Sequence, residues 1–269
     1  MSYSRMVVAE TCHRQYWWRY VLNHRGQPDN RYSLVGSTLA ISTEEWLKSE
    51  VWLNDQKNAA QALRDTIKRV WVEQVKRPHT LTEAEQKMEL GRALSMVENT
   101  IRGFVQCGAL TRKMEVEKKK VLALGGGHTL YARPDVVAWK SKSRCRVIDG
   151  KTTVKTAYLD PAQLAIYAAA WQKEHPGVDI DTGFLMFQTG EYIPVDWRAE
   201  WPSTVDRIKA AIDVARRLQG LSVEAEATPT SKCMFCDFRH KCKEYQAQVK
   251  TQVKQPIVGT SLEGEMHGQ

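Results

Sequence analysis

The chain has 269 residues, of which 42% are apolar, so it is long enough to bury the core of one large domain or of two small ones. Its 39 Lys and Arg residues exceed the 31 Asp and Glu residues and give a net charge of +8, which suits an anionic partner without requiring one. No apolar run of about 18 residues is available to cross a bilayer. The first residues also lack the apolar core of a signal peptide, so we expect an intracellular protein with no membrane partner.

The first 108 residues are predicted to be mainly helical. Residues 1–24 form one helix, whose aromatic and basic stretch at 15–20 is explained by packing, with base stacking as the alternative. A loop rich in turn formers is expected at 25–35. From Gly36 to about Gly108 apolar residues recur at three- and four-residue spacing, which is typical of amphipathic helices. This helical block shows no obvious chemistry of its own.

Strands are predicted from about Lys113 onward. Alternating or β-branched apolar residues fill 114–124, 128–139 and 144–153, and the glycines at 125–127 indicate the turn of a hairpin between the first two runs. A hairpin made of 130–139 and 144–153 would place Asp135 and Asp149 near one another. A helix then begins after Asp160, with Pro161 at its favoured first position, and ends at Pro176.

The remainder of the chain is predicted to hold two strands, at 181–190 and 191–197, and a helix at about 202–218. Beyond Gln246 the sequence is polar and contains glycine, so we expect a disordered tail over 246–269. Residues 1–245 are interpreted as a single domain.

The acids of the predicted hairpin suit the hydrolysis of a phosphodiester, which needs an acidified water and stabilisation of charge on the phosphate. A divalent metal supplies both. Mg²⁺ or Mn²⁺ prefers oxygen ligands, and Asp135, Asp149 and the backbone carbonyl of Gly150 can provide them. Lys151 lies two residues beyond Asp149 on a strand and points to the same face, where it can orient the attacking water or neutralise the phosphate.

Gln163 and Tyr167 lie one turn apart on the following helix and therefore on one face. Burial explains the tyrosine when it is taken alone, but a glutamine in an otherwise apolar stretch favours the wall of an active site. A lone Asp-x-Lys tripeptide is common by chance. The order of strand, Pro-Asp, strand, Asp-x-Lys and helix is what makes the pattern informative.

Three of the six cysteines are closely spaced, as Cys233, Cys236 and Cys242, while Cys12 stands far away in the sequence. In an intracellular protein this spacing indicates a metal site. Zinc would accept His240 or Cys12 as its fourth ligand, whereas a four-iron cluster would require a fourth cysteine. The other two cysteines, at positions 107 and 145, are explained as small buried apolar residues.

The motifs Pro134-Asp135, Asp149-Gly150-Lys151 and Gln163-x-x-x-Tyr167 resemble the RecB-like branch of the PD-(D/E)XK nuclease superfamily. The resemblance implies an α/β fold with a central mixed β-sheet flanked by helices, and metal-dependent cleavage of DNA, commonly from an end. It implies that the two aspartates hold metal, that the lysine is catalytic, and that the glutamine and tyrosine line the substrate path. The same branch often carries a glutamate before the hairpin, a position for which Glu117 and Glu115 are equal candidates.

One part of the family pattern is missing. The RecB-like branch usually has a metal-binding histidine about four residues after a glycine on an early helix, and Ala40 stands at that place. Glu44, one turn further on the same face, is an alternative donor, and a solvated surface glutamate is the simpler interpretation. The alanine therefore raises a second hypothesis, a DNA-binding or partner-binding module with weakened or lost catalysis.

The cysteine pattern resembles the iron–sulfur nucleases, namely the AddB-type nuclease domain and the CRISPR-associated iron–sulfur exonucleases. In these a [4Fe–4S] cluster joins the two ends of the chain, which implies Cys12, Cys233, Cys236 and Cys242 as ligands. The segment at about 45–112 is then a helical insertion or cap. The implied partners are DNA, as single strands or frayed ends, and proteins of recombination, repair or CRISPR adaptation, with a homo-oligomer as a further expectation. A zinc-binding structural protein remains the third alternative.

Overall fold

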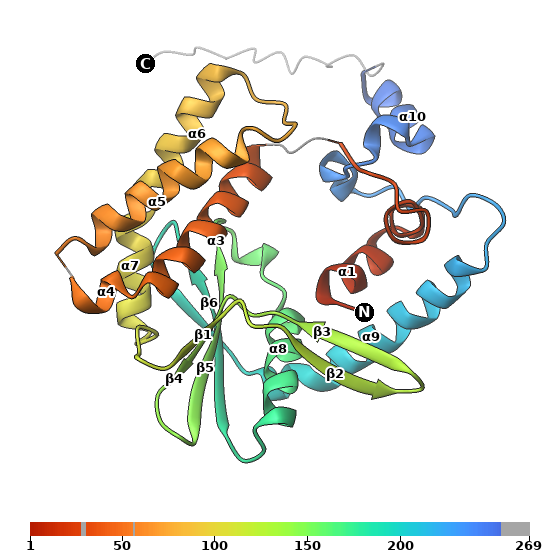
Figure 1. Cartoon of the computed structure of the whole chain (residues 1–269). Helices are drawn as coiled ribbons and strands as arrows, with labels where there is room; N and C mark the ends of the chain where they lie inside the picture. Colours follow the sequence, from red (N-terminus) through yellow and green to blue (C-terminus); the bar gives the residue numbers. More distant parts are fainter. Residues whose placement is uncertain (28–30, 56, 254–269) are drawn as a thin grey trace, which may run out of the picture.

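A five-stranded mixed β-sheet forms the centre of the computed structural model, which describes residues 1–27, 31–55 and 57–253 (Figure 1). The strand order is β1-β4-β5-β6-β7; β5 and β6 run parallel and all other neighbours antiparallel. The strands are β1 (Met114–Val116), β4 (Val136–Trp139), β5 (Arg144–Lys151), β6 (Asp179–Met186) and β7 (Tyr192–Val195). The predicted α/β class with a central mixed sheet is therefore confirmed.

A separate two-stranded hairpin consists of β2 (Lys120–Gly125) and β3 (His128–Ala132). The turn predicted at 125–127 is confirmed, but the two long strands predicted around it are each divided between the hairpin and the sheet. The second run breaks between Ala132 and Val136, where Pro134 offers no N–H to a ladder. The first breaks after Val116, where Glu117 has a φ of 54°.

The prediction that residues 1–108 are mainly helical is confirmed, but the bounds of the individual helices differ from those predicted. It comprises α1 (Tyr3–Thr11), α2 (His13–Tyr16), a π-helical turn (Trp17–Val21), α3 (Arg31–Ser49), α4 (Val51–Asn54), α5 (Ala59–Gln74), α6 (Glu83–Ser95) and α7 (Val97–Gln106). The third helix begins at Arg31, inside the predicted loop; residues 28–30 lie outside the described part of the chain.

The later helices are α8 (Pro161–Glu174), α9 (Trp197–Gln219) and α10 (Lys243–Val253). Helix α9 starts earlier than predicted because the Asp196 side chain accepts the N–H groups of Arg198 and Ala199, so the helix is capped ahead of Pro202. Residues 246–253, expected to be part of a disordered tail, are helical in α10, and the rest of that expected tail lies outside the described residues.

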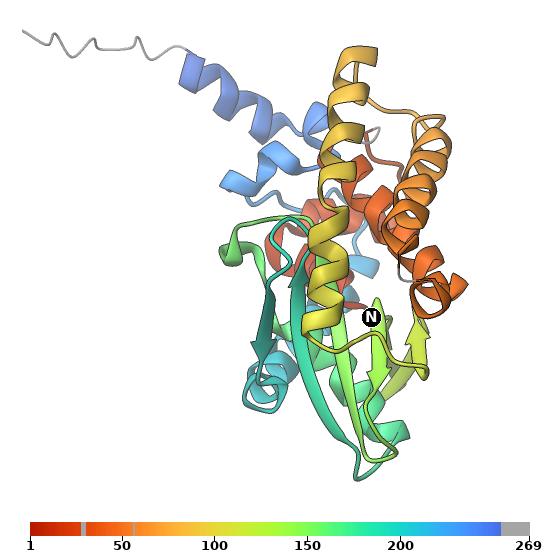
Figure 2. The same cartoon turned by 90° about the vertical axis from the view of Figure 1, so that its left-hand side faces the viewer.

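Helices cover both faces of the sheet, as the two views show (Figures 1 and 2). The side chains of Val137 and Val147 enter a core shared with α1, α8 and α9. Their neighbours Val136 and Ile148 point the other way, into a core shared with α3, α5 and α7. The helical block at 45–112 thus packs directly on one face of the sheet. None of the described helices has the length and apolar character of a membrane span.

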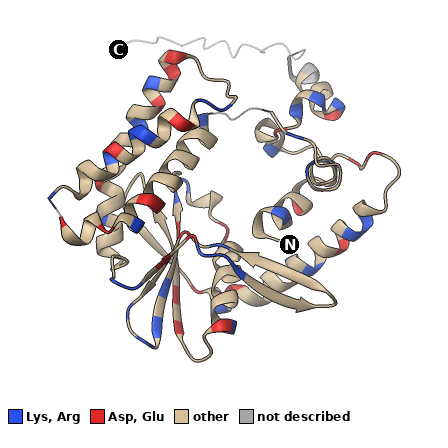
Figure 3. Cartoon of the chain, viewed as in Figure 1, with Lys and Arg blue, Asp and Glu red and all other residues tan. Residues whose placement is uncertain are grey.

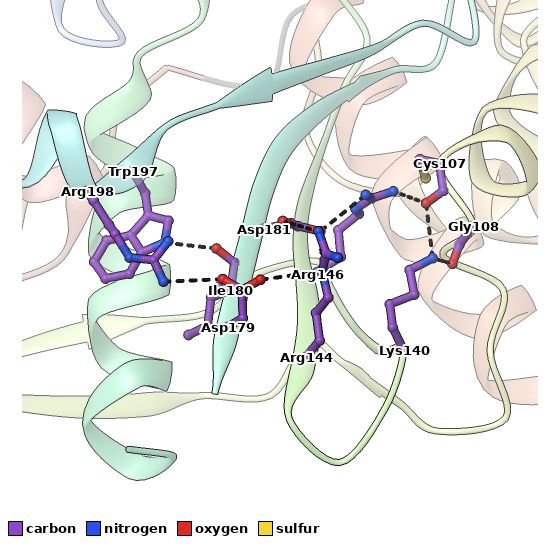
Figure 4. A network of polar contacts seen from close by, with 10 residues as sticks. All are labelled: Cys107, Gly108, Lys140, Arg144, Arg146, Asp179, Ile180, Asp181, Trp197 and Arg198. Atoms are coloured by element: carbon purple, nitrogen blue, oxygen red, sulfur yellow. Dashed lines mark hydrogen bonds and ion pairs between the residues drawn. The ribbon is translucent and has the colours of Figure 1, made fainter. Parts of the chain in front are cut away.

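A polar network fastens the sheet to the helices at the end remote from the acidic motif (Figure 4). The carboxylate of Asp181 accepts hydrogen bonds from Arg144 at 3.1 Å and Arg146 at 3.3 Å. Arg146 and Lys140 in turn donate to the carbonyl oxygen of Cys107, just beyond the last residue of α7. Cations at a helix C-terminus satisfy carbonyls that the helix itself leaves free, so this network orients α7 against the sheet.

Candidate active site

The two aspartates of the motif lie side by side where β4 and β5 pair. Val136 faces Ile148 in the antiparallel register, so the residues that flank this pair, Asp135 and Asp149, are brought together. Oδ2 of Asp135 accepts the N–H of Gly150 at 2.7 Å. The sequence-based prediction that a hairpin places these two acids close together is confirmed.

A continuous set of hydrogen bonds joins Asp149 to helix α8. Nζ of Lys151 lies 2.7 Å from Oδ2 of Asp149 and donates to Oε1 of Gln163 at 2.8 Å. Nε2 of Gln163 donates to Oδ1 of Asp149 at 2.8 Å and to the hydroxyl of Tyr167 at 2.9 Å. Because an ammonium only donates and a carboxylate only accepts, one orientation of the amide satisfies all of these contacts. The four predicted residues therefore form one connected network.

Helix α8 holds Gln163 and Tyr167 in place because its N-terminus is anchored. Asp160 caps the helix by accepting the N–H of Ala162 at 3.1 Å, and Pro161 follows at the first helical position. The Asp160 carboxylate also accepts two hydrogen bonds from Arg207 of α9, at 2.8 Å each, and one from the hydroxyl of Tyr3. Burial alone would raise the pKa of Asp160, but the bonds and charge of Arg207 outweigh it and lower that pKa.

Glycine is required at position 150, between Asp149 and Lys151, because an aromatic ring packs against its backbone. A β-carbon built on Gly150 would lie 2.1 Å from Cζ of Phe187, which is too close for any side chain. Phe187 follows β6 and donates its N–H to the carbonyl of Lys151 at 2.8 Å. This aromatic ring closes one wall of the site.

Of the two candidate glutamates, the structure brings Glu117 to the aspartates. The N–H of Glu117 donates to the carbonyl of Asp135 at 3.0 Å, and its carboxylate lies 2.5 Å from Nε of Arg133. Glu115 instead accepts the indole N–H of Trp139 at 3.0 Å and pairs with Lys118 at the base of the hairpin. Glu117 is the glutamate of the candidate site.

The carboxylates of the site repel one another. Burial raises the pKa of Asp135 well above its usual value, and the negative charges of Asp149 and Glu117 raise it further. Burial also raises the pKa of Glu117, with Glu44 and Asp149 adding to the shift against the opposing charge of Arg133. Asp149, 3% exposed, has its pKa raised by burial, while Lys151 counteracts the shift. A cation would relieve this repulsion.

A small cavity beside these acids is lined by Ala40, Glu44, Glu117, Asp135 and Gly150. Ala40, where the family pattern has a histidine, therefore lines the same cavity as the acids. Glu44 lies in the same cavity, although its Oε1 is 2.5 Å from Nζ of Lys48. Figure 3 shows acidic residues on α3 and at the end of β1, beside the basic connection to β2.

The oxygen donors around this cavity match the preference of Mg²⁺ or Mn²⁺. Among the described residues, however, no three His, Cys, Asp or Glu side chains are already arranged to hold a metal ion. The donor set thus fits a hard cation in its chemistry, and its side chains would have to converge on binding.

The four cysteines proposed as cluster ligands face one cavity. Cys12, at the junction of α1 and α2, lines it together with Cys233, Cys236 and Cys242 from the C-terminal segment. Burial raises the pKa of Cys236, and the other three thiols raise it further, which reflects their proximity. His240, the alternative fourth ligand, does not line this cavity. Cys107 and Cys145 are buried, as predicted, with exposures of 4% and 0%.

Sequence reasoning did not find three residues that shape the site: Tyr3, Arg133 and Phe187. Arg133 directly precedes Pro134-Asp135, so the sequence did offer one signal for it, a cation close to an acid of the motif. No signal marks Tyr3 or Phe187, because each reaches the site only through the tertiary fold.

Comparisons with known proteins place the chain in a family. A sequence profile of the PD-(D/E)XK nuclease superfamily matches residues 1–243, so the chain belongs to that superfamily. No functionally curated protein matches the chain.

Eleven chains of solved structures match. One is the crystal structure of a candidate exonuclease from Eubacterium rectale, with a TM-score of 0.56 and 13% identity over 90% of this chain and 88% of that one. At this identity the likeness shows the fold alone. Another is SSO0001, with a TM-score of 0.34 and 14% identity over 87% of this chain and 95% of that one, too low to support an argument.

Proposed function

We propose that the protein is a Mg²⁺- or Mn²⁺-dependent DNA exonuclease of the RecB-like iron–sulfur type. The observation that carries the proposal is the network of Asp149, Lys151, Gln163 and Tyr167 beside Asp135. A purely structural role does not explain why a partly buried lysine–carboxylate pair lies beside a second aspartate that lines a cavity. Cleavage from an end is supported by the resemblance of the motifs and by a fold shared with a candidate exonuclease.

Each residue has a distinct role in the proposed hydrolysis. Asp135, Asp149, Glu117 and the carbonyl of Gly150 would hold the cation, with Glu44 as a further donor at the same cavity. The bound cation supplies charge stabilisation and acidifies water. Lys151, 26% exposed, directs its ammonium toward the phosphate or the attacking water. Gln163 and Tyr167 fix the position of that ammonium and of Asp149.

The test is the release of acid-soluble nucleotides from linear DNA in Mn²⁺. We expect activity in the wild-type chain and its loss, by about 100-fold or more, in Asp149→Ala and Lys151→Ala. Glu115→Gln is the matched control, since that carboxylate lies outside the site. Equal release by the wild type and both active-site variants would refute the assignment, as would no release by any of them.

The second candidate function is DNA or partner binding without cleavage, and it is favoured by one observation. Ala40 faces the acids at the place where a metal-binding histidine is expected. This hypothesis predicts that the wild-type chain retains DNA but does not cut it with any divalent metal. Activity gained in Ala40→His would then indicate that the remaining site is competent and that only the metal ligand is lacking.

We further propose a [4Fe–4S] cluster held by Cys12, Cys233, Cys236 and Cys242. The four thiols face one cavity, and the cationic side chains of Arg14, Lys232 and Arg239 also line it, which suits the negative charge of a thiolate-ligated cluster. Such a cluster would join segments more than 200 residues apart and stabilise the fold by closing that long loop.

The cluster is tested on protein purified without oxygen. We expect a brown protein that absorbs at about 400 nm and contains about four irons per chain, and both properties should be lost in Cys236→Ser. Cys107→Ser is the control, because that thiol lies in the helical core. A colourless protein with one zinc per chain would support the structural zinc alternative instead.

A further inference from the structure

A large open cavity lies next to the candidate active site and has no role in the hydrolysis described above. Its volume is about 690 Å³, and it is bordered by the start of α3, by α6, by the segment that follows β5 and by the C-terminal cysteine segment. Its wall begins at Thr152, the residue immediately after Lys151. It also includes Gln188, which follows the ring that packs on Gly150. The cavity therefore lies next to residues of the candidate site.

Exposed aromatic rings are concentrated in this cavity. Among the described residues four aromatic side chains are classed as exposed, and three of them line it: Tyr32 at 60%, Tyr158 at 64% and Phe235 at 55%. The fourth, Tyr131, lies on the hairpin. The three rings come from segments far apart in the sequence, so a periodic helix or strand pattern does not account for their meeting. Large exposed apolar groups gathered in one place mark a binding surface.

The charge of the cavity indicates an anionic ligand. Lys155 lines it, with its Nζ 5.9 Å from the centre of the Tyr158 ring. Arg92 also lines it, and its guanidinium lies 3.5 Å from the buried Glu89 carboxylate. The cavity contains one acid, Asp237, whose carboxylate is paired with Arg19. Flat rings interleaved with cations are the combination that binds single-stranded nucleic acid, because bases stack on the rings while phosphates meet the charges.

We propose that this cavity binds a single-stranded segment of nucleic acid and leads it to Lys151, with bases stacked on Tyr158, Phe235 and Tyr32. The proposal rests on the proposed nuclease function and adds a selection of strand type. In a duplex the faces of the bases are covered by their neighbours, so only an unpaired end can use these rings. A protein partner with an acidic, apolar surface would be the alternative occupant.

The segment that carries Phe235 connects this cavity to the cysteine site. Phe235 stands between Cys233 and Cys236 in a short 3-10 helix, and the two cysteines line the neighbouring cavity. The position of one stacking ring is thus set by the same backbone that holds the thiols. This arrangement gives the C-terminal segment a role in strand binding as well as in holding the chain ends.

The experiment measures the binding of a labelled oligothymidylate of about 16 nucleotides, and of a blunt duplex of the same length, by fluorescence anisotropy in EDTA. We expect Tyr158→Ala and Phe235→Ala to weaken single-strand binding about 5- to 100-fold each and to leave duplex binding unchanged. Tyr158→Phe should bind like the wild type, whereas Tyr158→Leu should bind like Tyr158→Ala. Val105→Ala, which changes an equally exposed apolar residue outside the cavity, is the control.

Salt titration provides a second measurement. Lys155→Gln and Arg92→Gln should each reduce the slope of log affinity against log salt concentration by about 0.7 for the single strand. Unchanged single-strand affinity in both alanine variants, or equal affinity of the Leu and Phe variants at Tyr158, would overturn the proposal. Failure of the wild-type chain to bind any single strand would also overturn it and would favour a protein occupant.

Cleavage is measured separately, so the two proposals fail in distinguishable ways. Stacking-dependent binding without release of nucleotides in Mn²⁺ would retain the strand-binding site and refute the nuclease. Release of nucleotides by both alanine variants at the wild-type rate, with unchanged single-strand binding, would retain the nuclease and refute the strand-binding site.

Discussion

Replacing Gln163 by methionine tests the central network most directly. The side chain of Gln163 makes three hydrogen bonds, of which those to Asp149 and Lys151 involve charged groups. A hydrogen bond to a charged group contributes about 1.5–3 kcal/mol and a neutral one about 1 kcal/mol. Methionine keeps the length and volume of the side chain, and Lys151 retains Asp149 as a partner. We therefore expect Gln163→Met to lower the free energy of unfolding by about 3 kcal/mol.

Urea unfolding in EDTA, followed by tryptophan fluorescence, measures this loss without interference from a metal. Tyr167→Phe is the matched control, because it removes one neutral hydrogen bond from the same network and should cost about 1 kcal/mol. A Gln163→Met protein within about 0.5 kcal/mol of the wild type would refute the network as described.

The variant Gln163→Glu tests the same network through the pH dependence of stability. It replaces the N–H that faces Asp149 with a second carboxylate oxygen, so the pKa of the new acid should be raised in the folded state. An acid with a raised folded pKa destabilises the fold above that pKa, and protonation removes the penalty. We expect the stability deficit of Gln163→Glu, relative to the wild type, to shrink as the pH is lowered from about 7 to about 5.

Three further changes should have separable effects on urea unfolding. Gly150→Ala forces a β-carbon into the ring of Phe187 and should lower the free energy of unfolding by about 1–3 kcal/mol. The double variant Gly150→Ala with Phe187→Leu should recover most of this loss, and a double variant as unstable as Gly150→Ala would refute the packing of the ring on Gly150. Asp160→Asn keeps the helix cap but loses the ion pair. Because the pKa of Asp160 is lowered in the folded state, the free energy of unfolding of the wild type should exceed that of this variant near pH 7. This difference in stability should vanish as the pH falls through the folded pKa, and a difference that stays constant with pH would contradict the ion pair. In the absence of divalent metal near pH 7, Glu117→Gln should stabilise the fold because the pKa of Glu117 is raised. Glu115→Gln should destabilise it because the pKa of Glu115 is lowered, and equal signs for the two variants would contradict the charge assignment.

Local signals in the sequence were sufficient for the elements that carry the site. The cap at Asp160 followed by Pro161 fixed the start of α8, and two apolar runs around a short turn predicted the pairing of β4 with β5. The proximity of Asp135 and Asp149 followed from that pairing alone. These features depend on neighbours in the chain, which sequence patterns describe.

Features that depend on tertiary contacts were not predictable in this way. Glu115 and Glu117 are two residues apart, so strand periodicity places both on one face and cannot choose between them. The structure separates them because β1 ends at Val116 and the backbone of Glu117 turns to a φ of 54°. Phe187 likewise meets Gly150 only once β5 and β6 lie side by side.

Helix α8 is buried along nearly its whole surface, which restricts how the protein can move. Nine of its side chains, from Ala162 to Trp171, are buried against the sheet and the neighbouring helices. Amides in such a helix exchange with solvent only when the core opens, whereas the exposed segment at 154–158 can open locally. Gln163 and Tyr167, which are proposed to position Lys151 and Asp149, therefore sit on a helix that opens only together with the core. Any adjustment to a bound strand has to come from the surrounding segments.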